Sequence, residues 1–176
     1  MDRIKSKIRT IPDFPKKGVI FRDITTLLKD PNGFREALNE FVLRYKDEEI
    51  TKIAGIETRG FIIAGALADR LHLGFVPIRK KGKLPHKTFR QEYDLEYGKD
   101  TIEIHRDALT KNDKVLIVDD LIATGGTAGA ATKLVERIGA EVVECAFIID
   151  LPDLGGSNKL KENGYTTFSL VEFKGK

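Results

Sequence analysis

The sequence predicts an α/β fold in which a mostly parallel sheet is flanked by helices. From residue 51 onward, strand-like and helix-like segments alternate, a pattern typical of parallel strands joined by right-handed helical crossovers. The runs VLIV at 115–118 and CAFII at 145–149 are apolar on consecutive residues, as expected for strands covered on both faces. With 176 residues, of which 41% are hydrophobic, the chain fits one compact domain over residues 1–176.

The first 35 residues are expected to form a small N-terminal hood beside the sheet. Isoleucines recur at near-helical spacing until prolines interrupt the pattern, which predicts a short amphipathic helix over residues 2–10, followed by an extended segment. Asp30 and Pro31 then supply an N-cap and a first-turn proline. A second helix is therefore predicted from this point to about Tyr45.

The sheet and its covering helices are expected to follow in chain order. The predicted strands lie at 52–56, 75–79, 114–119, 141–149 and around 166–171, and the predicted helices at 60–71 and 126–138. Residues 80–106 carry many charges and aromatic rings with two extended stretches. We expect this segment to be a hairpin-like, flexible loop insertion with a mobile tip.

Composition argues against several classes of function. The 30 Lys and Arg residues nearly balance the 27 Asp and Glu residues, which leaves a formal charge of +3 and argues against a nucleic-acid partner. No apolar run approaches the ~18 residues of a membrane span, and the basic N-terminal residues have no apolar run behind them, so we expect a cytoplasmic protein with no membrane partner. Cys145 is expected to be a packing thiol in a buried strand, and the three histidines form no zinc-like cluster.

The strongest local signal is the segment VLIVDDLIATGGTAGAA at residues 115–131. A buried strand here ends in Asp119 and Asp120, and a glycine-bearing turn then opens a helix. Successive strand residues face opposite sides, so we expect both carboxylates to lie where the chain leaves the sheet. Adjacent carboxylates at that place can accept hydrogen bonds from vicinal hydroxyls and stabilise positive charge that develops nearby.

The turn that follows, Thr124-Gly125-Gly126-Thr127, is suited to bind a phosphate. Its glycines permit positive φ, the amides at the helix N-terminus are free to donate, and two hydroxyls stand beside them. The segment is neither a Walker loop nor the GxGxxG dinucleotide fingerprint. A phosphate cradle next to a diol clamp describes a site for ribose 5-phosphate.

An apolar strand, two acidic residues and TGGT together resemble the signature of the phosphoribosyltransferases that use phosphoribosyl pyrophosphate. Four further motifs are similar to the branch of this family that acts on adenine: PDFPKKGVIFRDIT at 12–25, ETRGF at 57–61, IRKKGKLP at 78–85 and YDLEYGKD at 93–100. The resemblance runs in order from about residue 11 to the C-terminus. It implies the type I phosphoribosyltransferase fold, with residues 1–35 as a base-binding hood and 80–106 as the flexible loop.

The same resemblance implies the activity and the ligands. The implied reaction forms AMP and pyrophosphate from adenine and phosphoribosyl pyrophosphate in purine salvage, with Mg²⁺ as cofactor and a homodimer as the assembly. No protein side chain is expected to ligate the metal, because the substrate would hold Mg²⁺ for the most part. The chemistry of the implied reaction is consistent with the motifs, since an oxocarbenium-like sugar needs nearby anions and a pyrophosphate leaving group needs cations.

Roles for individual residues follow from the resemblance, position by position. The ribose hydroxyls would be held by Asp119 and Asp120, and the 5-phosphate by Ala123, Thr124, Gly125, Gly126 and Thr127. Pyrophosphate would be bound by Glu57, Thr58, Arg59, Arg79, Lys80 and Lys83, some of these acting across the dimer interface. Adenine would lie against Ile20, Phe21 and Arg22, and catalysis would involve Glu96 and Tyr97 on the closing loop. Residues 86–91 match no pattern of the family and receive no role.

Some alternatives stay open at this stage. The basic turn 79–83 could be a solvated surface turn or a nucleic-acid patch, although its place directly after a parallel strand favours anion binding. Phe21 could be an ordinary core aromatic in a short buried strand. At the level of function, the base could be hypoxanthine, guanine or xanthine, or the chain could be a non-catalytic regulator that binds phosphoribosyl pyrophosphate as an effector.

Overall fold

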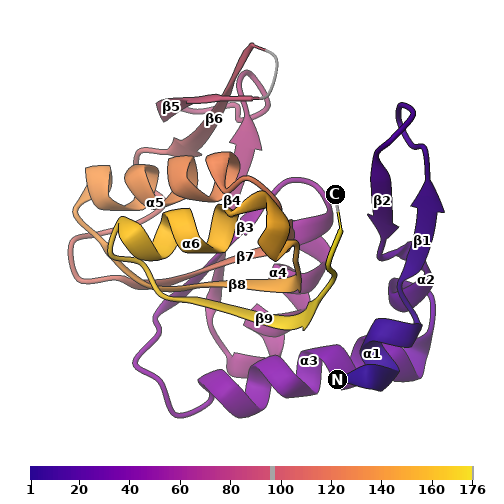
Figure 1. Ribbon diagram of the computed structural model, residues 1–176. Helices are drawn as coiled ribbons and strands as arrows, with labels where there is room; N and C mark the ends of the chain where they lie inside the picture. The colour runs from indigo at the N-terminus through magenta and orange to yellow at the C-terminus, as the bar shows by residue number, and fades with distance from the viewer. Residues whose placement is uncertain (96–97, 176) are drawn as a thin grey trace.

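The computed structural model describes residues 1–95 and 98–175 and is built on a seven-stranded sheet (Figure 1). The strand order is β5-β6-β4-β3-β7-β8-β9. The strands are β3 (Lys52–Ile56), β4 (Gly74–Lys80), β5 (Thr88–Asp94), β6 (Lys99–His105), β7 (Lys114–Ile122), β8 (Glu141–Asp150) and β9 (Thr167–Glu172). Strands β4, β3, β7, β8 and β9 run parallel to one another, whereas β5 and β6 form an antiparallel hairpin at one edge of the sheet. The mostly parallel sheet and the hairpin-like insertion are therefore confirmed.

Helices cover both faces of this sheet. One face carries α3 (Pro31–Tyr45) and α4 (Arg59–Leu71), and the other carries α5 (Gly126–Ile138) and α6 (Gly156–Glu162), which the short helix η1 (Pro152–Leu154) precedes (Figure 1). Alternate residues of β7 enter opposite clusters: Leu116 packs with α3 and α4, whereas Ile117 packs with α5. Burial on both faces explains the continuous apolar run of this strand.

The N-terminal segment differs from its predicted form. Helix α1 (Asp2–Ser6) ends early, and β1 (Arg9–Pro12) pairs antiparallel with β2 (Ile20–Asp23) before the short helix α2 (Thr25–Leu28). The prediction of a helix over residues 2–10 is therefore wrong after Ser6. Strand pairing satisfies backbone groups of residues 9–12, and their partner strand lies about ten residues further along the chain.

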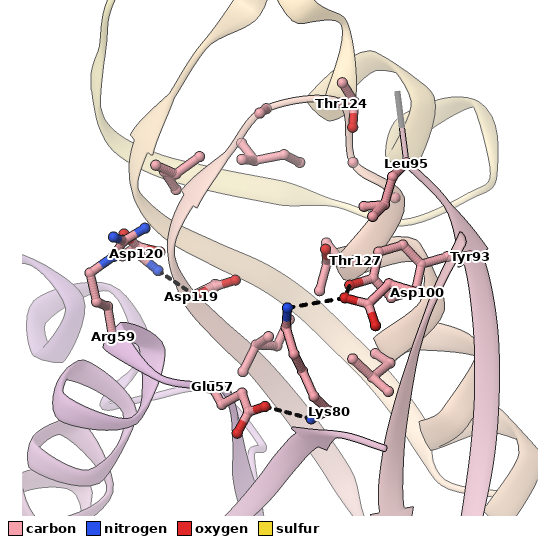
Figure 2. Close-up of a pocket in the computed structure, with 18 of the residues that line it drawn as sticks. Glu57, Arg59, Lys80, Tyr93, Leu95, Asp100, Asp119, Asp120, Thr124 and Thr127 are labelled. Atoms are coloured by element: carbon pink, nitrogen blue, oxygen red, sulfur yellow. Dashed lines mark hydrogen bonds and ion pairs between the residues drawn. The ribbon is translucent and has the colours of Figure 1, made fainter. Parts of the chain in front are cut away.

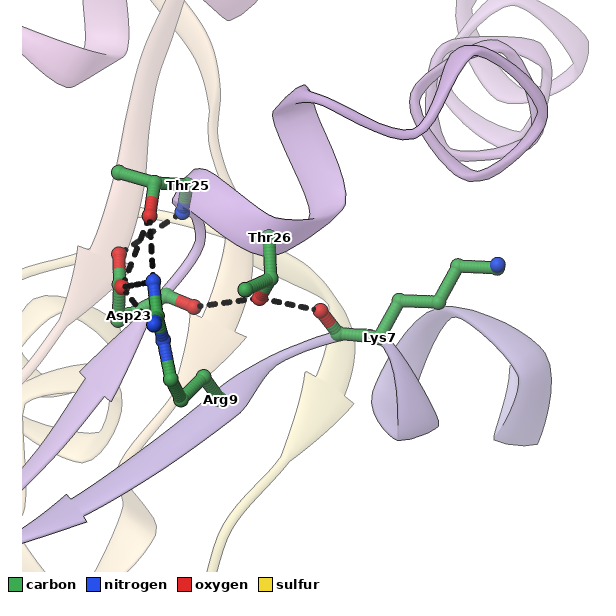
Figure 3. A network of polar contacts seen from close by, with 5 residues as sticks. All are labelled: Lys7, Arg9, Asp23, Thr25 and Thr26. Atoms are coloured by element: carbon green, nitrogen blue, oxygen red, sulfur yellow. Dashed lines mark hydrogen bonds and ion pairs between the residues drawn. The ribbon is translucent and has the colours of Figure 1, made fainter.

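A polar network centred on Asp23 fastens this hairpin to α2 (Figure 3). Arg9 donates to Asp23 Oδ2 from Nε at 3.1 Å and from Nη2 at 2.8 Å, and the Thr25 amide donates to Asp23 Oδ1 at 2.8 Å. Burial opposes ionisation of Asp23, but the hydrogen bonds from Thr25 and Arg9 outweigh it and lower its pKa. Thr26 Oγ1 donates to the Lys7 carbonyl at 2.6 Å, so α2 is also hydrogen-bonded to the residues that precede β1.

The predicted cap of α3 is confirmed, and so is the packing role of Cys145. Asp30 Oδ1 accepts hydrogen bonds from the amides of Asn32 at 3.0 Å and Gly33 at 2.9 Å. Cys145 is fully buried in β8, and burial raises the pKa of its thiol to about 12. Within the described residues, none of the helices has the length and apolarity that a membrane crossing requires.

Candidate active site

A cavity of about 590 Å³ opens at the carboxyl ends of β3 and β7 (Figure 2). Its walls come from the turn after β3, the end of β7, the start of α5 and the β5–β6 hairpin. Ligands of open parallel sheets bind at this edge, because loops diverge there above the strand ends. The cavity brings together most of the residues that were expected to bind phosphoribosyl pyrophosphate.

Asp119 and Asp120 both line the cavity, but they do not lie beyond the sheet as predicted. Strand β7 continues to Ile122, because its pairing with β8 extends to the partners Leu121–Ile149 and Ile122–Asp150. Asp119 Oδ1 accepts a hydrogen bond from the Asp120 amide at 2.8 Å. Burial of its carboxyl, and then the neighbouring charge of Asp120, raise the pKa of Asp119 well above its ordinary value. Ionising Asp119 beside the Asp120 carboxylate is therefore unfavourable, and a ligand's hydroxyls or a nearby cation would offset that cost.

The close approach of α4 to β7 depends on a glycine. A Cβ placed on Gly60 would lie 2.8 Å from Asp119 Oδ1 and 3.0 Å from the Val118 carbonyl. Any side chain at this position would displace the carboxylate or the strand. The glycine of the ETRGF motif therefore allows the turn after β3 to approach the carboxylate pair.

Arg59 connects the carboxylates with the hood. Its Nε donates to Asp120 Oδ2 at 2.5 Å (Figure 2). Its guanidinium carbon lies 5.5 Å from the centre of the Phe21 ring. Sequence reasoning expected this residue to be the main charge for pyrophosphate. In the structure its side chain lies between the expected ribose clamp and the expected base hood.

Residues 123–127 are expected to hold the 5-phosphate and are called the phosphate loop below. All five, from Ala123 to Thr127, line the cavity. Gly125 has a φ of 77°, which the glycine permits without strain, and α5 begins at Gly126. The N-terminal amides of α5 therefore open toward the cavity, as expected for an anion cradle.

Behind the loop stands Gly156, which sequence reasoning missed. Its amide donates to the Ala123 carbonyl at 2.9 Å, and a Cβ placed on it would lie 2.3 Å from that oxygen and 2.6 Å from the Gly125 nitrogen. The backbone at the start of α6 is thus in direct contact with the phosphate loop. The adjacent glycines of LPDLGG at 151–156 were the available signal.

On the opposite wall, Glu57 organises the first residues of the basic turn. It accepts hydrogen bonds from Arg79 Nε at 2.8 Å and from the Lys80 amide at 2.7 Å. Lys80 Nζ reaches across the cavity to Asp100 Oδ2 at 3.1 Å, and this contact raises the pKa of Lys80 (Figure 2). Glu57, Thr58 and Lys80 line the cavity, whereas Arg79 and Lys83 are not part of its described lining.

A buried carboxylate holds the rest of the basic turn. Glu103 on β6 is 1% exposed and accepts hydrogen bonds from the amides of Gly82 at 2.9 Å and Leu84 at 3.2 Å. It also accepts from Thr88 Oγ1 at 3.2 Å and Arg90 Nε at 3.1 Å. Nothing in the local sequence singled out this residue, because its partners lie on other segments.

The hairpin supplies two polar cavity residues that the sequence analysis did not assign. Tyr93 on β5 donates from its hydroxyl to Asp100 Oδ2 at 3.3 Å, and both line the cavity (Figure 2). Both lie in the YDLEYGKD motif, which was the available signal. Glu96 and Tyr97, the expected catalytic residues, lie outside the residues that the structure describes.

The expected base-binding residues lie on β2. Phe21 is half-buried and faces Arg59, and the ring of Phe14 meets it edge-on with ring centres 5.2 Å apart. Arg22 lies over the Phe173 ring at 4.3 Å and donates to Thr10 Oγ1. Ile20 is 37% exposed. Phe21 is therefore not a fully buried core aromatic, and of this set it lies nearest to the cavity residues.

Comparisons with known proteins agree with this geometry. Residues 24–173 match the family described as the phosphoribosyl transferase domain. The chain is 61% identical to an adenine phosphoribosyltransferase of Rhizobium leguminosarum bv. trifolii, over 98% of this chain and 95% of the relative. The crystal structure of the adenine phosphoribosyltransferase from Rhodothermus marinus matches with a TM-score of 0.92 and 50% identity, covering 98% and 97% of the two chains.

A solved structure from Saccharomyces cerevisiae matches with a TM-score of 0.91 and 38% identity over 97% of each chain. It is an adenine phosphoribosyltransferase complexed with D-2,5-dideoxy-2,5-imino-altritol 1,6-bisphosphate and adenine. These similarities extend over nearly the whole of this chain, the hood included. The chain belongs to the phosphoribosyltransferase family, in the group formed by the adenine phosphoribosyltransferases.

Proposed function

We propose that this protein forms AMP and pyrophosphate from adenine and phosphoribosyl pyrophosphate in purine salvage. The observation that carries the proposal is that Asp119, Asp120 and the phosphate loop line one and the same cavity. Such an arrangement matches the two ends of a ribose 5-phosphate unit, the vicinal hydroxyls and the phosphate. The names of the relatives, and the adenine in the yeast structure, support adenine as the base.

The carboxylate pair has the main electrostatic task in this proposal. Breaking the bond between ribose C1 and pyrophosphate leaves positive charge on the sugar, which Asp119 and Asp120 stabilise while they accept hydrogen bonds from the ribose hydroxyls. The amides and hydroxyls of residues 123–127 hold the 5-phosphate. This fixed contact positions C1 for attack by the base.

Pyrophosphate binds at the opposite side of the cavity, on the turn of residues 57–59 and on Lys80. Lys80 then exchanges its contact with Asp100 for the leaving group. Mg²⁺ bound to the substrate's own oxygens would neutralise part of the leaving group's charge, and a cation near the ribose would offset the cost of ionising Asp119 beside Asp120. Arg79 and Lys83 complete the pyrophosphate site, with some of the cationic contacts made from a partner subunit.

A homodimer is part of this proposal, and the cytoplasm is its expected location. Exposed apolar side chains support the dimer: Ile62 on α4 is 48% exposed and Phe75 on β4 is 38% exposed. Light scattering of the purified protein tests the assembly directly. A mass of one chain at working concentration would contradict the dimer.

Adenine is expected to lie beside Phe21 and Arg59, which offer a ring face and a planar guanidinium. Backbone carbonyls at residues 20–22 would accept from its 6-amino group. Glu96, with Tyr97 beside it on the closing loop, would take the proton that leaves the base when N9 attacks C1. These roles come from the family resemblance and the chemistry of the reaction.

The decisive experiment incubates the protein with phosphoribosyl pyrophosphate, Mg²⁺ and one nucleobase at a time, and quantifies the nucleotide formed. We expect AMP, with adenine preferred over hypoxanthine by up to ~10⁴-fold because a keto oxygen leaves buried acceptors unpaired. Comparable rates with hypoxanthine or guanine would reassign the base. Binding of phosphoribosyl pyrophosphate without turnover of any base would indicate a regulator instead.

A further inference from the structure

A second hollow, of about 600 Å³, lies at the other end of the β5 strand from the loop tip. It is bounded by the start of β5, the residue after β6 and the end of α5. Five of its lining residues carry basic groups: His86, Lys87, Arg90, Arg106 and Arg137. None of the described residues that line it is acidic, and it shares no lining residue with the active-site cavity.

Two of these arginines are held in place around one aromatic ring. The guanidinium carbons of Arg106 and Arg137 lie 5.0 Å and 5.1 Å from the centre of the Phe89 ring. Arg106 Nε donates to the Thr88 carbonyl at 3.2 Å, and Arg137 Nη1 donates to the Arg90 carbonyl at 3.2 Å. Within the described chain, neither arginine forms an ion pair with a carboxylate.

This anchoring leaves strong donors available. A guanidinium has five N–H groups, and each of these two arginines uses one on a backbone carbonyl, so the others remain for a ligand. The planar groups are oriented before any ligand arrives, which reduces the ordering cost of binding. Arg90 differs from them, because its Nε already donates to buried Glu103.

We propose that this hollow binds a small polyphosphate anion at a site separate from the active site. Arginine pairs bind phosphate groups through charge-assisted, bidentate hydrogen bonds. A concave volume of this size is typical of small-molecule sites, whereas the overall charge of +3 does not favour a long nucleic acid. The uncompensated positive charges repel one another until an anion occupies the space between them.

Calorimetric titration with inorganic triphosphate tests the proposal. The protein is first saturated with AMP, so that triphosphate can bind only at the pyrophosphate part of the active site and at the proposed site. Wild type is compared with the double variant Arg106→Gln/Arg137→Gln, whose two positions are exposed. The matched control is Arg35→Gln/Lys46→Gln, which removes the same charge from exposed positions on or beside α3.

We expect two triphosphate ions per chain for wild type and for the control, and one for the double variant. AMP affinity and melting temperature should be equal in all three proteins, which shows that the active site and the fold are intact. Indistinguishable titrations of wild type and the double variant would overturn the proposal. Loss of the second ion in the control as well would also overturn it, because the effect would then reflect net charge alone.

Discussion

The contact between Gly156 and the phosphate loop predicts that a side chain at position 156 would lower kcat/KM. In a Gly156→Ala variant the new methyl group would lie 2.3 Å from the Ala123 carbonyl oxygen, whereas ordinary contact begins near 3.4 Å. The loop and α6 must therefore separate by about 1.1 Å. Both neighbouring atoms belong to the backbone, so no side chain can rotate away to relieve the clash.

The size of the effect follows from this displacement. A misplacement of about 1 Å in a positioning group costs ~10²-fold in rate, or about 2.7 kcal/mol of transition-state stabilisation. We therefore expect kcat/KM for phosphoribosyl pyrophosphate to fall by ~10²-fold. Ribose 5-phosphate should bind more weakly by a similar factor, while pyrophosphate, whose proposed site lies at the opposite side of the cavity, should bind as in wild type.

The assay pairs steady-state kinetics with calorimetric titration of ribose 5-phosphate and of pyrophosphate. Gly129→Ala is the matched control, because a methyl group at this position of α5 meets only Leu160 Cδ2, at 3.8 Å. The control should keep its kinetics and gain up to about 1 kcal/mol of stability from helix propensity. The reasoning fails if Gly156→Ala retains wild-type kinetics, or if it loses pyrophosphate affinity as much as ribose 5-phosphate affinity.

Three further predictions concern ionisable groups. Asp119→Asn should lower turnover but raise the melting temperature at pH 7. The folded-state pKa of Asp119 lies above its unfolded value of about 3.9, so its ionisation lowers the stability of the folded state as pH rises, and asparagine cannot ionise. Melts from pH 4 to 8 should show this gain shrinking toward pH 4, and a gain independent of pH would contradict the assignment. Glu144→Gln should reduce the free energy of unfolding by about 2 kcal/mol, because buried Glu144 accepts hydrogen bonds from Arg44 Nε and Nη2 at 2.8 Å and from the Tyr45 hydroxyl at 2.6 Å. Urea titration measures this change, and an unchanged unfolding midpoint would refute the prediction. Glu96→Gln should slow single-turnover AMP formation by ~10²–10⁴-fold with little change in phosphoribosyl pyrophosphate affinity, and a rate within about twofold of wild type would remove Glu96 from the catalytic list.

The regular elements of the core could be predicted because their signals are local. The Asp30 side chain caps the amides two and three residues later, so the start of α3 is visible in a short stretch of sequence. The apolar run of β7 and the glycine turn after it likewise predict a covered strand and an anion cradle from neighbouring residues alone. The family motifs added the expected site residues, of which the structure brings Glu57, Thr58, Arg59, Lys80, both aspartates and the phosphate loop to one cavity.

Sequence periodicity was misleading where a distant partner decided the local structure. The near-helical spacing of Ile4, Ile8 and Ile11 extended the predicted helix to residue 10, yet residues 9–12 form β1 because β2 provides hydrogen-bond partners across the hairpin. Asp119 and Asp120 remain in the sheet because the pairing of β7 with β8 continues beyond them. In both cases the backbone groups pair with a segment that the local pattern does not contain.

The sequence by itself determined the type of sheet, the starts of α3 and α5, the glycine turn before α5 and the family, since each depends on motifs whose own residues are close together along the chain. Tertiary structure alone decided that Arg59 joins Asp120 to Phe21, that Gly156 supports the phosphate loop and that Arg106 and Arg137 meet around Phe89. These contacts join segments far apart in sequence. Their geometry depends on how helices and strands pack, because packing fixes which distant atoms come within bonding distance.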